Sequence, residues 1–201
     1  MEDDFRPDHS FELLAGGGVA HDEDGTLRRI GQVLLFIQGL ERSIRFVMTF
    51  VLQKEGVLTV EKLEAQEANE REKTIGYFLT QLRYRADLDP SIDDRLRLFL
   101  NQRNTLVHHL MDIPGWSLET PEGLQVANEF ITEVQTSAIW LRFFFAGLMK
   151  AWAEQDGIGM IFDDEPELDF LTAWRDLATS SVAPKSRNSP GRSSDPSRKR
   201  M

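Results

Sequence analysis

One predicted helix carries a cation, an amide and an imidazole along a single edge. Arg103, Asn104 and His108 lie within segment 96–110, whose apolar residues recur at helical spacing. At about 100° of rotation per residue, Arg103 falls in the middle of the apolar stripe, with Asn104 and His108 together beside it. The stripe consists of Leu96, Phe99, Leu100, Leu106, Val107 and Leu110. A permanent cation beside a group that exchanges a proton near neutral pH is compatible with acid–base chemistry on an anionic ligand, and equally with an ion pair between helices beside a structural histidine.

Arg103 needs a partner, and the sequence leaves three kinds open. An unpaired arginine is almost never fully buried, because removing its charge from water is costly. A carboxylate, a second subunit or an anionic ligand would satisfy it, and Glu41 and Glu129 are the candidate carboxylates. An ion pair sealed between helices would make this edge structural. An Arg103 and a His108 that open into a cleft at a two-fold axis would favour catalysis.

The segment Arg103–His108 (RNTLVH) resembles the R-x4–6-H signature of the HEPN superfamily. This superfamily consists of small helical-bundle proteins, many of which are metal-independent endoribonucleases. In the family a polar residue, often Asn, follows the Arg, as Asn104 does here. The segment Thr74–Leu79 (TIGYFL) is similar to a T-hydrophobic-G motif in an upstream helix of several HEPN groups. The resemblance covers roughly residues 26–155.

The resemblance implies a particular way of cleaving RNA. The substrate's own 2′-hydroxyl attacks the phosphorus, so the enzyme must supply a base, an acid and a cation. His108 would serve as base or acid, Arg103 would bind the phosphoryl oxygens, and Asn104 would orient either the imidazole or the phosphate. His109, Arg97 and, more weakly, Thr74 are expected to bind substrate. Neither a metal nor a cofactor is expected.

The resemblance also implies partners. One chain supplies one well-placed His, and HEPN nucleases typically dimerise so that two signatures face each other across a cleft. We therefore expect a homodimer acting on RNA in a toxin-like or defence role, with an antitoxin or a nucleotidyltransferase as a further partner. Some HEPN toxins carry a Tyr two residues after the His, which a nucleotidyltransferase modifies, but this chain has Leu110 there. The alternative is a non-catalytic HEPN-fold module that dimerises and binds a nucleotide, RNA or a protein.

The elements that must position this edge are all helical. Apolar residues at spacings of three and four predict helices over 26–56, 90–111, 121–157 and 165–177, and a region over 59–82 that is either one bent helix or two. No alternating run of useful length occurs. The expected fold is all-α, an antiparallel bundle of four main helices with a short C-terminal one. The expected organisation is an acidic flexible segment 1–25, a helical domain 26–180 and a disordered basic tail 181–201.

Composition narrows the function classes. The chain of 201 residues has a net charge of −10, which argues against a broad duplex-DNA surface. It contains no cysteine, which rules out disulfides and thiolate metal sites and fits a reducing cytoplasm. We expect no membrane span. The acidic clusters 22–24 and 163–165 lack the spacing of a calcium loop, and the aromatic run 143–145 with Trp140 and Trp152 is expected in the core and at a subunit interface.

Overall fold

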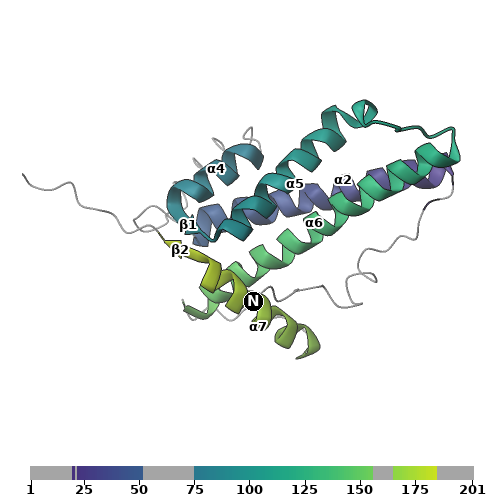
Figure 1. Cartoon of the computed structure of the whole chain (residues 1–201). Coiled ribbons are helices and arrows are strands. Elements are labelled where there is room, and N and C mark those ends of the chain that lie inside the picture. Colours follow the sequence, from purple (N-terminus) through teal and green to yellow (C-terminus); the bar gives the residue numbers. More distant parts are fainter. Residues whose placement is uncertain (1–19, 21, 52–74, 156–164, 185–201) are drawn as a thin grey trace, which may run out of the picture.

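The fold is an all-α bundle, as the sequence predicts (Figure 1). The computed structural model describes residue 20 and residues 22–51, 75–155 and 165–184. Its helices are α2 (Glu23–Phe46) with a π-helical turn η1 (Val47–Val51), α4 (Ile75–Arg85), α5 (Pro90–His108) with a 3-10 turn η2 (Leu110–Asp112), α6 (Pro121–Gln155) and α7 (Glu165–Ser181). Most of the helical region predicted over 59–82 lies outside the described residues. None of the described helices is long and apolar enough to cross a membrane.

Three long helices lie side by side and form the body of the molecule (Figure 1). α2 and α6 run in the same direction, since Arg29 bonds to Asn128 near their starts and Phe46 stacks edge-on against Trp152 near their ends. α5 runs antiparallel to both of them (Figure 1). α6 has 35 residues, which corresponds to about 52 Å of helix and lets it span the whole domain.

Side-chain caps set where the helices begin. Asp22 accepts a hydrogen bond from the Gly25 amide at 2.7 Å, so α2 starts at Glu23, three residues before the predicted start. Asp89 accepts from the Ser91 amide at 2.8 Å, and Pro90 occupies the first helical position of α5.

The core forms where α6 meets the other helices. It contains the buried side chains of Val33, Ile37, Leu40, Ile44, Phe78, Leu82, Leu96, Phe99, Ile131, Val134, Phe144, Phe145 and Trp174, among others. Trp140, Phe144 and Phe145 are buried in the core, as expected, whereas Phe143 and Trp152 are only partly buried. Gly147 lets α6 and α7 approach closely, because a Cβ there would lie 2.4 Å from the carbonyl oxygen of Trp174.

A short sheet ties two distant parts of the chain together, and the sequence did not predict it. Strand β1 (Ala86–Leu88) pairs antiparallel with β2 (Val182–Pro184), with Asp87 opposite Ala183. The Asp89 amide also donates to the carbonyl of Ser181 at 2.9 Å. The first residues of the predicted tail are therefore part of the folded domain. The remainder of that tail and residues 1–19 lie outside the described residues.

Candidate functional site

Arg103 pairs with Glu41 of α2. Its Nη2 lies 3.3 Å from Glu41 Oε1, and the two side chains are 21% and 22% exposed. Of the two candidate carboxylates, Glu41 is thus the one that meets the guanidinium, whereas Glu129 accepts a hydrogen bond from Gln125. The Nε of Arg103 is buried and has no hydrogen-bond partner among the residues that the structure describes. The pair is half-buried, and so the cation is neither sealed in a dry core nor fully open to solvent.

Asn104 and His108 continue the edge toward solvent. Arg103 Nη1 donates to Asn104 Oδ1 at 3.5 Å, and Asn104 is half-buried. His108 is the last residue of α5 and is exposed. Within the described residues its imidazole makes no hydrogen bond or ion pair, and its ring centroid lies 6.3 Å from that of His109. A free, accessible imidazole is able to take up or release a proton on a bound ligand.

The apolar stripe predicted around Arg103 is only partly buried. The buried residues of α5 are Ile92, Leu96, Phe99, Gln102 and Leu106. Val107 is 42% exposed, and Leu110 lies beyond the end of the helix, in η2. Arg103 therefore lies at the flank of the buried face rather than at its centre, which explains how its guanidinium retains some contact with water.

The predicted substrate-binding residues differ in their placement. Arg97 is exposed, and its Nη2 lies 2.8 Å from Asp93 Oδ2. The spacing from Arg97 to Asn104 and His108 puts all three on one face of α5. His109 is exposed, and its Nδ1 lies 3.1 Å from Asp112 Oδ2. Thr74 lies outside the described residues.

The C-terminal part of α5 is locally basic. Residues 95–111 include Arg95, Arg97, Arg103, His108 and His109 and contain no Asp or Glu. Arg95 is held over the ring of Trp140, with its Cζ 4.6 Å from the centroid. Carboxylates from outside this segment meet three of these groups, since Glu41 pairs with Arg103, Asp93 with Arg97 and Asp112 with His109. The segment is therefore basic in sequence, but its charges are largely paired in the structure.

A second polar cluster, not foreseen from the sequence, lies at the start of α6. Arg29 is 8% exposed and donates to Asn128 Oδ1 at 2.5 Å and to Thr132 Oγ1 at 3.0 Å. Within the described residues no carboxylate pairs with it, and burial lowers the pKa of its guanidinium. The burial of Arg29 could have been inferred from spacing, because Val33 and Ile37 of the buried stripe follow it at intervals of four residues.

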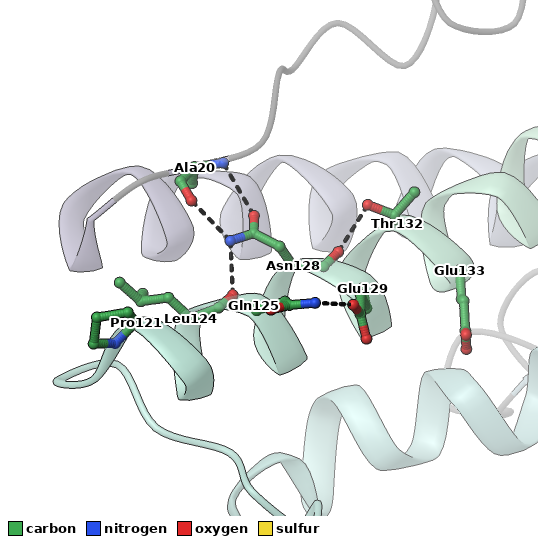
Figure 2. Close-up of a pocket in the computed structure, with 8 residues that line it drawn as sticks. All are labelled: Ala20, Pro121, Leu124, Gln125, Asn128, Glu129, Thr132 and Glu133. Carbon is green, nitrogen blue, oxygen red and sulfur yellow. Dashed lines mark hydrogen bonds between the residues drawn. The ribbon is translucent and has the colours of Figure 1, made fainter.

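A groove of about 620 Å³ runs beside this cluster (Figure 2). It is lined by Ala20, Pro121, Leu124, Gln125, Asn128, Glu129, Thr132 and Glu133. Figure 2 shows the amide of Asn128 between the backbone of Ala20 and that of Leu124; it accepts from the Ala20 amide and donates to both carbonyl oxygens. Because two carboxylates line the groove, it is unsuited to a phosphate, and none of the predicted site residues lines it. The edge of α5 remains the candidate site.

Comparisons with family models, with curated proteins and with solved structures found no match to this chain. A family assignment therefore depends on the residues of the α5 edge and on the helical fold that positions them.

Proposed function

We propose that this chain is a metal-independent endoribonuclease of HEPN type, with a toxin-like or defence role in the cytoplasm. The observation that supports this most is the free imidazole of His108 on the same edge as Arg103 and Asn104. The lack of acidic residues over 95–111 supports RNA as the substrate, since no carboxylate on this segment repels a phosphate.

In the proposed reaction the 2′-hydroxyl of the substrate attacks the adjacent phosphorus. One imidazole takes the hydroxyl proton, and the bond from phosphorus to the 5′-oxygen breaks as that oxygen receives a proton from the second imidazole. The products are a 2′,3′-cyclic phosphate and a 5′-hydroxyl. Arg103 stabilises the extra negative charge on the phosphoryl oxygens, and Asn104 orients the phosphate or the imidazole.

Among the described residues one chain supplies one free imidazole for two proton transfers, so the proposal includes a homodimer in which His108 of each copy serves one of them. The Arg103–Glu41 pair favours the second candidate, a non-catalytic HEPN-fold module in which this edge binds RNA, a nucleotide or a protein. An antitoxin partner fits either candidate, whereas Leu110 lacks the hydroxyl group that a nucleotidyltransferase would modify.

The deciding experiment is cleavage of a labelled RNA pool in excess EDTA by the wild type, His108→Ala and His109→Ala. His109→Ala is the matched comparison, because His109 is an exposed neighbouring imidazole that pairs with Asp112 and is expected to bind substrate rather than to transfer a proton. We expect the wild type and His109→Ala to leave 2′,3′-cyclic phosphate ends, and His108→Ala to be inactive. Absence of cleavage by the wild type at any workable concentration would reject the nuclease in favour of the binding module.

A further inference from the structure

The solvent-facing side of α2 carries a regular row of alternating large and small residues. Leu27, Gly31, Leu35 and Gly39 follow one another at intervals of four residues, which aligns them as one ridge on the helix surface. Leu27 is 48% exposed and Leu35 is 70% exposed. Nothing lies within 4 Å of the position that a Cβ would take at Gly31 or Gly39. The part of the chain that the structure describes therefore leaves the ridge uncovered.

Nothing within the described residues explains the two glycines. Glycine in the interior of a helix is destabilising relative to alanine, and it is usually retained where another backbone comes close. Gly147 is such a case, since the backbone of α7 fills the space beside it. Gly31 and Gly39 face open space instead, which indicates that whatever approaches them is not part of this chain's described fold.

We propose that this ridge is the contact surface between two copies of the chain. The row is self-complementary: if α2 of a second copy packs in the opposite direction, Leu27 lies over Gly39 of that copy, and Leu35 lies over its Gly31. Ridges of this four-residue type pack at a crossing angle of about −50°, a common arrangement of helix pairs. A two-fold axis between residues 31 and 35 repeats every contact twice.

Charges at the two ends of the ridge match the same arrangement. Asp24 and Arg42 are exposed on this side of α2, and within the described residues neither makes an ion pair or a hydrogen bond. When the two helices run in opposite directions, Asp24 of each copy lies at the end occupied by Arg42 of the other, within reach of the long arginine side chain. A parallel pairing would instead place like charges together, so the charge pattern selects the antiparallel one.

This surface also determines where the candidate sites lie, an inference that rests on the proposed function. α5 lies beside α2 and runs antiparallel to it (Figure 1). Arg103 pairs with Glu41, and His108 follows Arg103 by five residues, in the direction of the start of α2. An antiparallel two-fold contact between the α2 helices keeps both α5 helices on the same side of the dimer. The two Arg103–His108 edges then face one another across the axis, as a shared site requires.

Sedimentation equilibrium of the full chain tests the surface through charge reversal. We expect a dimer whose dissociation constant rises at least about tenfold in Asp24→Arg and in Arg42→Asp, because each single change opposes like charges. The double variant Asp24→Arg/Arg42→Asp restores the opposite pairing, and we expect its dissociation constant to return close to that of the wild type. Circular dichroism of each variant establishes that the helices are retained.

Leu35→Asp and Leu98→Asp form a matched pair of apolar-to-acid changes. Both leucines are more than half exposed, but Leu98 lies on α5, outside the ridge. We expect Leu35→Asp to weaken the dimer by about a hundredfold and Leu98→Asp to leave it unchanged. A monomeric wild type, a double reversal that fails to restore association, or equal effects of the two leucine changes would overturn the proposed surface.

RNA cleavage by the same variants separates this inference from the proposed function. If the ridge variants dissociate as expected but the wild-type dimer cleaves no RNA, the interface stands and the nuclease is rejected. If the wild type cleaves RNA and the ridge variants retain both activity and association, the nuclease stands and the interface is rejected.

Discussion

Glu41 Oε1 lies 3.3 Å from Arg103 Nη2 and so neutralises the cation that a phosphate would need. In the catalytic interpretation the phosphate competes with this carboxylate for the guanidinium. In the structural interpretation the pair joins α2 to α5 and has no further role. The two side chains are about one-fifth exposed, so the pair is accessible enough for either interpretation to be tested directly.

Changing Glu41→Gln should increase the affinity for single-stranded RNA by several fold, because the guanidinium of Arg103 no longer has an anionic competitor. Fluorescence anisotropy in a His108→Ala background measures binding without cleavage. The control is Glu129→Gln, which removes a carboxylate of the groove that Arg103 does not contact. A lower RNA affinity in Glu41→Gln would contradict the competitive role and favour the structural one.

Asn128→Ala should reduce the free energy of unfolding by about 2–4 kcal/mol. The change removes the acceptor for a buried guanidinium and for the Ala20 amide, together with two donated hydrogen bonds. Urea denaturation followed by circular dichroism gives the value. Gln125→Ala, one turn away on the exposed side of α6, should cost less than about 0.5 kcal/mol. Equal losses of unfolding free energy in the two variants would show that the buried cluster stabilises the fold no more than an exposed position does.

Gly147→Ala should destabilise the protein by about 1–3 kcal/mol, because the new methyl group would overlap the backbone of Trp174 and push α7 away from α6. The same change at Gly31 adds a methyl group in open space and removes a mid-helix glycine. At dilutions where the chain is monomeric, it should stabilise by about 0.4–1 kcal/mol. Thermal unfolding of both variants measures the two effects. A midpoint temperature of Gly147→Ala equal to or above that of the wild type would contradict the prediction.

The pH dependence of stability should include a contribution from Asp93. Burial opposes its ionisation, but the hydrogen bonds and charges of Arg83 and Arg97 outweigh burial and lower its pKa below 3.8. The stabilisation is therefore fully present above pH 3.8 and is lost as the pH falls through the lower pKa of the folded state. We expect Asp93→Asn to lose stability at pH 6 and to show a flatter acid profile than the wild type. Parallel acid profiles of the two proteins would exclude this contribution.

The helices could be predicted from the sequence because their apolar residues repeat at helical intervals and because Asp89-Pro90 is a strong start signal. That Arg103 needs a partner could also be predicted, since a charge on an apolar stripe is costly to bury alone, but the sequence left open whether a carboxylate, a second subunit or an anionic ligand would meet it. The exposure of Val107 could not be predicted. It lies on the predicted apolar stripe, yet it is 42% exposed, because a helical wheel gives directions around a helix but not where the neighbouring helices end.

Other features depend on contacts between distant parts of the chain. The strand Val182–Pro184 is three residues long and has no alternation to detect; it is a strand because Ala86–Leu88 lies beside it. The buried position of Arg29 depends on Asn128 and Thr132, about a hundred residues later, which together supply neutral acceptors. The helical spacing from Val33 and Ile37 places Arg29 on the buried stripe of α2, but nothing near it in the sequence identifies the acceptors that meet its guanidinium.

The pairing of β1 with β2 makes the chain between them a closed loop. Asp87 and Ala183 are nearly a hundred residues apart, so bringing them together costs loop-closure entropy that helix formation alone does not repay. This contact should form late in folding, after α5, α6 and α7 have assembled by nearer contacts. By the same argument this contact should be among the first to open on unfolding. Release of β2, the three residues after α7, would free the segment that leads into α5, the helix that carries the candidate site.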